Sequence, residues 1–135
     1  VGMQRSVLDS YALLAFLQDE AGAGHVRLLL ERSSTGDCTL HMSEVNYAEV
    51  KYMTIRKRGT HDWEKVARHL PSLPIRFHGV TRALADTAAS FKANNRISLA
   101  DAFAAALARE LEADLVTGDP EFECLKDEIA ISWLK

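Results

Sequence analysis

Four acidic residues that lie far apart in the 135-residue chain occupy positions from which carboxylates could act on a bound ligand. They are Asp9, Glu49, Asp101 and Asp119. Some have an ordinary structural explanation, because Asp9 and Asp101 can cap helices and Asp119 can cap a turn that begins at Pro120. The four residues therefore indicate a functional site as a set rather than one by one.

Glu49 is the hardest of the four to explain by local structure. Its neighbours at helical spacing include Val45, Tyr52 and Met53, which predicts that it lies on a face of its helix that points into the core. No Lys or Arg occupies the spacing that would neutralise it on that face. Since burying an unpaired carboxylate costs several kcal/mol, we expect Glu49 to have a partner from elsewhere.

A cation would be such a partner if the four carboxylates meet. Clustered carboxylates repel one another unless a positive charge lies among them. Mg²⁺ and Mn²⁺ prefer oxygen ligands, whereas the five histidines show no spacing typical of zinc. The expected cofactor is therefore Mg²⁺, with Mn²⁺ as the alternative. In such a site the metal can lower the pKa of a water molecule and orient it for attack on a phosphodiester.

The elements that carry these residues follow from the apolar pattern. Asp101 lies in the first turn of an apolar-periodic helix with a start like a capping box. Asp9 follows a short apolar strand over 6–8, and Asp119 follows another over 115–116. Because the carboxyl ends of parallel strands and the N-termini of the next helices meet at one edge of a sheet, these residues could face one point.

Strands and helices alternate along the rest of the chain. The expected strands cover 6–8, 38–40, 75–77, 115–116 and 129–134, and the expected helices run over about 10–17, 26–32, 43–58, 63–70, 81–94 and from 98 onward. Such alternation predicts an α/β fold in which a parallel sheet is covered on both faces and the last strand lies at an edge. The length predicts one domain over 1–135.

The formal net charge of -3 conceals a basic central part of the chain. Residues 51–96 hold ten Lys or Arg against three Asp or Glu, whereas the flanks hold six against sixteen. Arg56, Lys57 and Arg58 end the predicted helix that carries Glu49, where the helix dipole alone would favour them. A basic zone of this kind can also bind phosphates.

Cysteine content and hydropathy predict a location for the protein. Cys38 and Cys124 form no C-x-x-C pair and no disulfide framework, so we expect two buried, reduced thiols and a cytoplasmic protein. No apolar run approaches the roughly 18 residues that a membrane span needs, so we expect no association with membranes.

Four segments together resemble the PIN domain family, most closely the VapC-type toxins of bacterial and archaeal toxin-antitoxin pairs. They are Val7-Leu8-Asp9-Ser10, Asn46-Tyr47-Ala48-Glu49-Val50, Ser98-Leu99-Ala100-Asp101-Ala102 and Thr117-Gly118-Asp119-Pro120-Glu121-Phe122. Their order and approximate spacing match the family over nearly the whole chain. The resemblance implies a three-layer α/β/α sandwich, Mg²⁺- or Mn²⁺-dependent endoribonuclease activity on RNA, homodimerisation and inhibition by a small cognate antitoxin.

Residue roles follow from the same resemblance. The implied catalytic and metal-binding quartet consists of Asp9, Glu49, Asp101 and Asp119, in which Asp9 and Asp101 are the first candidates for direct metal ligation. Ser10 and Thr117 would supply hydroxyls that orient those carboxylates. One departure is that Ser10-Tyr11 replaces the frequent Thr-Asn, which leaves a supporting amide role unfilled. In this light the basic residues expected to contact RNA phosphates are Arg56, Lys57 and Arg58.

Two other functions fit parts of the pattern. A receiver-like signalling module would also hold Mg²⁺ at acidic strand ends, but it requires adjacent acidic residues after the first strand and a Lys at a late strand exit. Here Ser10 follows Asp9, and Thr117-Gly118-Asp119 carries no Lys. A catalytically idle RNA-binding scaffold would keep the fold, although four intact carboxylates argue against it. The pattern also leaves open whether such a nuclease is a toxin or a housekeeping enzyme.

Overall fold

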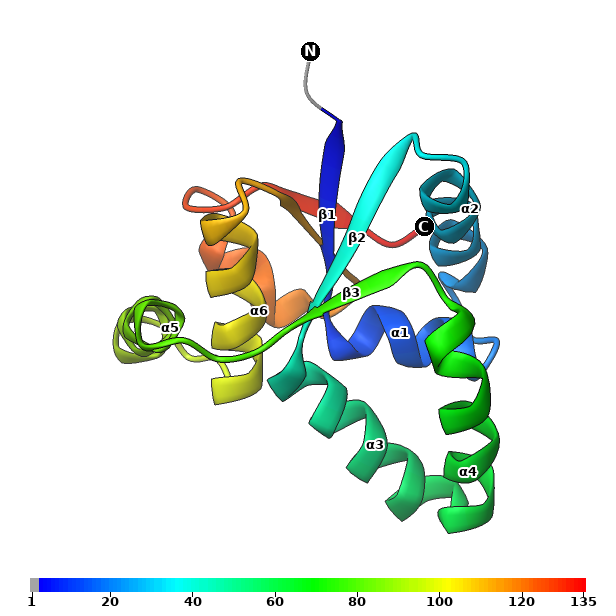
Figure 1. Cartoon of the computed structure of the whole chain (residues 1–135). Coiled ribbons are helices and arrows are strands. Elements are labelled where there is room, and N and C mark those ends of the chain that lie inside the picture. Colours follow the sequence, from blue (N-terminus) through cyan, green and yellow to red (C-terminus); the bar gives the residue numbers. More distant parts are fainter. Residues whose placement is uncertain (1–2) are drawn as a thin grey trace.

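In the computed structural model, which describes residues 3–135, five strands form one parallel sheet (Figure 1). They are β1 (Gln4–Leu8), β2 (Cys38–Ser43), β3 (Ile75–His78), β4 (Asp114–Thr117) and β5 (Ile131–Trp133). Their order is β3-β2-β1-β4-β5, so the chain adds strands first on one side of β1 and then on the other. The point where this direction reverses lies between β1 and β4, and ligands of open α/β sheets bind at such a point.

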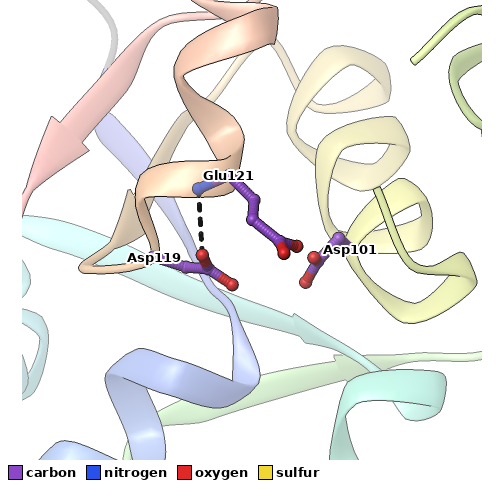
Figure 2. Close-up of side chains that lie close together, drawn as sticks. All are labelled: Asp101, Asp119 and Glu121. Carbon is purple, nitrogen blue, oxygen red and sulfur yellow. Dashed lines mark hydrogen bonds between the residues drawn. The ribbon is translucent and has the colours of Figure 1, made fainter. Parts of the chain in front are cut away.

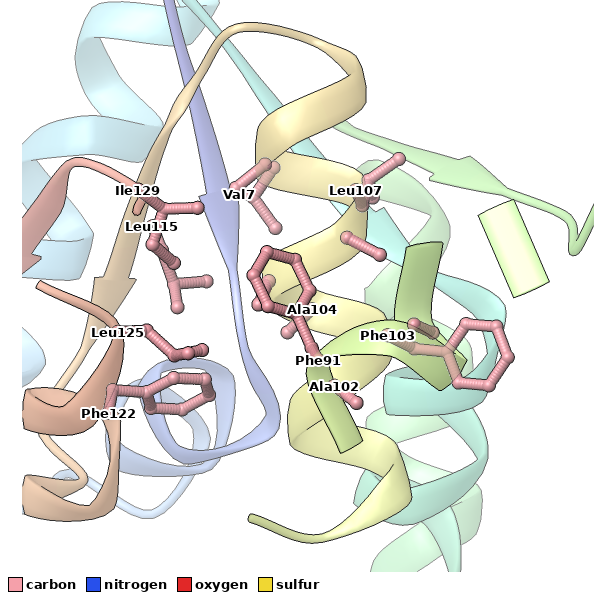
Figure 3. Packing of buried hydrophobic residues seen from close by; sticks show 14 of the residues in the cluster. Val7, Phe91, Ala102, Phe103, Ala104, Leu107, Leu115, Phe122, Leu125 and Ile129 are labelled. Carbon is pink, nitrogen blue, oxygen red and sulfur yellow. The ribbon is translucent and has the colours of Figure 1, made fainter. Parts of the chain in front are cut away.

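The register of the central strands places apolar residues on both faces of the sheet. Val7 pairs with Leu115, and Leu8 pairs with Val116. Because successive side chains of a strand point to opposite faces, Val7 and Leu115 pack in one buried cluster and Leu8 and Val116 pack in another. Figure 3 shows the first cluster, in which Val7, Leu115 and Phe122 lie beside side chains of the neighbouring helix.

Six α-helices and two short 3₁₀ helices connect the strands in the described residues. The α-helices are α1 (Ser10–Leu17), α2 (Ala23–Ser34), α3 (Glu44–Arg58), α4 (Thr60–His69), α5 (Arg82–Asn94) and α6 (Leu99–Glu110). The 3₁₀ helices are η1 (Leu70–Ser72) and η2 (Pro120–Leu125). Helices α5 and α6 cover one face of the sheet and α1 and α2 the other, which gives three layers (Figure 1). Helices α3 and α4 project beyond the carboxyl ends of the strands.

Helix α6 is buried between the sheet and α5. Every residue from Asp101 to Ala108 is buried, and five of these eight are alanines. Small side chains allow a helix to approach both neighbours closely, and a helix that is apolar on all sides is typical of a core position. The first turn of this helix therefore places Asp101 inside the molecule at the carboxyl edge of the sheet.

The structure confirms the predicted α/β fold and its parallel sheet, and it moves several element boundaries. The helix predicted over 63–70 begins at Thr60, the one predicted over 26–32 covers Ala23–Ser34, and the last strand is only Ile131–Trp133. Cys38 is buried as predicted, but Cys124 is exposed because it lies on the outer side of η2. Residues 1 and 2 of the predicted domain lie outside the described residues. None of the helices formed by residues 3–135 combines the length and the hydrophobicity that a membrane crossing requires.

Candidate active site

The four acidic residues of the predicted quartet line one pocket of about 270 Å³ at the carboxyl edge of the sheet. The lining is completed by Ser10, Tyr11, Leu14, Met53, Ser98 and Glu121. The pocket lies where the chain leaves β1 and β4, at the point where strand order reverses. Residues separated by more than a hundred positions therefore meet because neighbouring parallel strands end at the same edge.

Asp9 follows β1 and is held on both carboxylate oxygens. Its Oδ1 accepts a hydrogen bond from the backbone N–H of Ala12 at 2.8 Å, which caps α1, and its Oδ2 accepts one from the hydroxyl of Thr117 at 2.5 Å. Only 2% of Asp9 is exposed. Burial raises the pKa of Asp9 to about 7, although the bonds from Thr117 and Ala12 act to lower it. Asp9 therefore caps α1 and lines the acidic pocket at the same time.

Asp101 lies in the first turn of α6, where Ser98 caps the helix. The hydroxyl oxygen of Ser98 accepts a hydrogen bond from the N–H of Asp101 at 3.0 Å. Burial is the largest cause that raises the pKa of Asp101 to about 6, and the charge of Asp119 is the next. Glu49 and Glu121 raise it further. The carboxylate of Asp101 therefore lies in the combined field of three other acidic side chains.

Asp119 is coupled to Asp9 through Thr117. The hydroxyl of Thr117 donates to Asp9 and accepts a hydrogen bond from the N–H of Asp119 at 3.0 Å. Asp119 in turn accepts a bond on Oδ1 from the N–H of Glu121 at 2.9 Å, which caps η2. The predicted role of Thr117 as a hydroxyl that contacts a carboxylate thus has a geometric basis.

Glu121 belongs to the most compact acidic group of the pocket. Each of Asp101, Asp119 and Glu121 offers an oxygen within 4.8 Å of the others, and Figure 2 shows their side chains pointing toward one another. Sequence reasoning missed Glu121, and it placed Asp9 and Glu49 among the metal ligands, although both lie outside this compact group. The sequence did contain a signal for Glu121, namely the predicted cap by Asp119. An Asp that caps a turn accepts a hydrogen bond from the backbone two positions later, which brings that residue close to it.

Glu49 lines the pocket, but the prediction that it lies on a core-facing side of its helix is wrong. The face that carries Glu49 is not buried, since Tyr52 is 46% exposed and Met53 42% exposed. The buried stripe of α3 is instead Asn46, Val50 and Thr54. Helix α3 projects beyond the sheet (Figure 1). The face that carries Glu49 therefore borders the pocket rather than the core.

Ser10 contacts α3 instead of a carboxylate. Its hydroxyl donates to the carbonyl of Asn46 at 3.4 Å and accepts from Nδ2 of Asn46 at 3.2 Å. The same Nδ2 donates to the carbonyl of Ala100 at 3.2 Å. The fully buried Asn46 therefore supplies an amide that joins α1, α3 and α6 beside the acidic residues. Sequence reasoning left this amide role unfilled, although Asn46 lies one helical turn before Glu49.

The three predicted basic residues at the end of α3 line two different grooves. Arg56 and Lys57 line a groove that shares Leu14, Glu49 and Met53 with the acidic pocket. Arg58 lines a different groove, together with Asp62 of α4. The guanidinium of Arg56 lies 5.2 Å from the centre of the Tyr52 ring, and Nζ of Lys57 lies 3.9 Å from a carboxylate oxygen of Glu20.

Fold and site together define a three-layer α/β/α protein with a carboxylate-lined pocket at the switch point of its sheet. Residues 6–127 match the PIN domain family, and the chain belongs to that family. This match confirms the family that the sequence motifs predicted. No curated protein matches the chain in sequence.

Solved structures with the same fold include chains of toxin-antitoxin complexes. DNA-bound VapBC from Salmonella typhimurium has a TM-score of 0.76 at 16% identity, over 98% of this chain and 100% of that chain. VapBC2 from Rickettsia felis, bound to a promoter DNA fragment, has a TM-score of 0.75 at 14% identity, with the same coverage. VapC20 from Mycobacterium tuberculosis, a toxin that cleaves the sarcin-ricin loop, has a TM-score of 0.73 at 16% identity, over 94% and 98%. At these identities the likeness concerns the fold.

Proposed function

We propose that this protein is a divalent-metal-dependent endoribonuclease and the toxin of a VapBC-type toxin-antitoxin pair. The observation that carries the proposal is the meeting of Asp101, Asp119 and Glu121 within 4.8 Å in a pocket that Asp9 and Glu49 also line. Membership of the PIN domain family and the shared fold with VapC20 support the same activity.

The pocket suits a hard divalent cation. Its charged lining is made of carboxylates alone, and Mg²⁺ and Mn²⁺ prefer oxygen ligands. Asp101, Asp119 and Glu121 would hold the ion, with Asp9 and Glu49 beside them. When bound, such a cation supplies Lewis-acid activation of a water molecule and stabilises negative charge at the leaving oxygen. The raised pKa values of Asp9 and Asp101 reflect the burial and mutual repulsion that a cation would relieve.

The chain's own residues position the reacting groups. The bonds from Ala12 and Thr117 fix the carboxylate of Asp9, and Ser98 holds the first turn of α6 and thus Asp101. Glu49 is half-buried at the rim, and no hydrogen bond or ion pair within residues 3–135 engages its carboxylate. Glu49 can therefore accept the proton of the attacking water.

Arg56 and Lys57 provide the positive charge for an RNA strand. Their groove begins at Glu49 and Met53, so a strand whose scissile phosphate lies in the acidic pocket can run along it. Contacts of this kind neutralise phosphates without reading the sequence. Arg58 faces the groove with Asp62 and has no part in this path.

A cognate antitoxin, a homodimer and a cytoplasmic location complete the proposal. Two of the structures with the same fold come from DNA-bound VapBC complexes, which supports an antitoxin as the partner. A receiver-like module is less compatible with the site, because no Lys within residues 3–135 lines the pocket.

The test is cleavage of single-stranded RNA by the purified chain with Mg²⁺ or Mn²⁺. We expect cleavage that a chelator abolishes and that Asp101→Asn reduces by roughly a hundredfold or more, since the variant removes a charge from the centre. The matched control is Asp86→Asn, which neutralises an exposed carboxylate on α5 and should cleave like the wild type. Equal cleavage by Asp101→Asn and the wild type would refute the site.

A further inference from the structure

Tyr11 stands at the mouth of the acidic pocket. It lies in the first turn of α1, directly after Asp9 and Ser10, and it lines the pocket together with Asp9 and Asp119. Its side chain is 47% exposed, whereas the next four residues, from Ala12 to Ala15, are buried. The local chain therefore turns one aromatic ring outward at the point where the carboxylates gather.

The ring of Tyr11 packs closely against the backbone at Gly118. A Cβ atom at position 118 would lie 2.4 Å from Cε1 of Tyr11 and 3.0 Å from Cδ1 and Cζ. No L side chain fits there while the ring keeps its position. The φ angle of Gly118 is outside the left-handed range that favours glycine, so space for the Tyr11 ring is the structural reason for glycine here.

The fold itself makes little use of the ring. Tyr11 belongs to none of the three buried apolar clusters, and its hydroxyl forms no hydrogen bond with the rest of residues 3–135. An aromatic ring that is held against the backbone on one side and open on the other is suited to stacking on a nucleobase. A base is neutral, so neighbouring carboxylates do not repel it as they would repel a phosphate.

We propose that the ring of Tyr11, which packs against Gly118, stacks on the base of an unpaired nucleotide next to the phosphodiester that is cleaved. The inference rests on the proposed ribonuclease function and adds a requirement on the substrate, because a base within a duplex is already stacked and cannot cover the ring. Leu14 and Met53 also line the pocket and continue its apolar surface into the groove of Arg56. The nucleotides that follow would take this direction.

The experiment uses the whole chain and short single-stranded oligoribonucleotides in which 2-aminopurine replaces each base in turn. Binding is followed by fluorescence quenching with Ca²⁺ in place of Mn²⁺, and cleavage is measured separately with Mn²⁺. We expect one position of the probe to be quenched by the wild type and by Tyr11→Phe but not by Tyr11→Leu. We also expect Tyr11→Leu to raise KM by roughly tenfold to a hundredfold, with a smaller change in kcat.

Controls separate this subsite from the activity itself. Leu28→Ala truncates an exposed apolar side chain on α2 and should behave like the wild type. Equal quenching and equal KM for Tyr11→Leu, in a protein that cleaves RNA, would overturn the subsite and leave the ribonuclease function in place. Quenching that depends on the Tyr11 ring, in a protein that does not cleave RNA, would support the base-stacking site and overturn the ribonuclease function. If Tyr11→Leu changes the particle mass in light scattering but not KM, the ring belongs to a protein interface and the subsite is overturned.

Discussion

The hydroxyl of Thr117 donates a hydrogen bond to Oδ2 of Asp9, and these two residues are 108 positions apart in the chain. The same hydroxyl accepts the N–H of Asp119, so one oxygen atom joins the exits of β1 and β4. Both partners carry carboxylates that line the acidic pocket. The geometry of the candidate site therefore depends on a side chain that is itself fully buried and uncharged.

Thr117→Val should lower both stability and activity. The variant keeps the shape of the side chain but leaves a buried carboxylate of Asp9 and the N–H of Asp119 each without one partner. We expect a loss of about 1–3 kcal/mol in the free energy of unfolding, measured by urea denaturation. Thr87→Val, which removes an exposed hydroxyl on α5, should change that free energy by no more than about 0.5 kcal/mol. Equal values for the two variants would contradict the role of Thr117.

Asn46→Ala should loosen the contact of three helices. It removes the amide group that donates to Ser10 and to the carbonyl of Ala100, and both acceptors are next to residues of the acidic pocket. We expect a loss of about 1–3 kcal/mol in unfolding free energy together with weaker Mn²⁺ binding. The control is Asn94→Ala, whose exposed amide donates only to Ser90 of its own helix. An Asn46→Ala protein with unchanged Mn²⁺ affinity would show that the amide serves the fold alone.

Stability of the metal-free protein should fall as pH rises. The pKa of Asp9 is raised to about 7 and that of Asp101 to about 6, from an ordinary value of 3.8. At these two sites the folded state therefore binds more protons than the unfolded state between pH 3.8 and about 7, so both make stability decrease with pH across this range. His41, whose pKa burial lowers to about 4, opposes them at only one site. Thermal melts in chelator should show this decrease, and Asp9→Asn should make it smaller.

Mn²⁺ should reverse that trend at high pH. Above pH 7 the carboxylates are ionised, and a cation can replace the protons that the pocket has lost. The rise in melting temperature on addition of Mn²⁺ should thus be larger at high pH than at low pH. An equal rise in melting temperature at high and at low pH would contradict binding of Mn²⁺ at these carboxylates.

Gly118→Ala should reproduce the effect of removing the Tyr11 ring. The added methyl group would lie 2.4 Å from Cε1 of Tyr11, and the ring can swing away because it is the end of a flexible side chain. We expect an increase in KM like that of Tyr11→Leu, and no further increase in the double variant, since the two changes remove one interaction. Gly24→Ala is the control, because a methyl group there meets nothing within 4 Å. Additive effects on KM would show that Gly118 acts independently of the ring.

Local signals in the sequence were sufficient to predict the positions of three of the acidic residues. Asp9 and Asp119 each follow a short apolar run, and Asp101 follows Ser98 at capping distance. Each of these signals involves only a few adjacent residues. The parallel sheet could also be predicted, because strands alternate with helices.

Features that depend on long-range packing could not be predicted in the same way. Strand order follows from pairings between residues far apart in the chain, which no local pattern specifies. The exposure of Tyr52 and Met53 follows from the projection of α3 beyond the sheet, so an apolar stripe was mistaken for a core face. Glu121 and Asn46 acquire their positions only when η2, α3 and α6 come together.

The central claim is that carboxylates from separate elements together bind one hard cation. Calorimetric titration of Mn²⁺ into the purified chain tests it most directly, with Asp101→Asn and the exposed-surface control Asp86→Asn measured alongside. We expect saturable binding to the wild type and to Asp86→Asn, and binding to Asp101→Asn that is weaker by roughly tenfold or more. Wild-type protein that shows no saturable binding, or an Asp101→Asn protein that binds as tightly as the wild type, would contradict the claim.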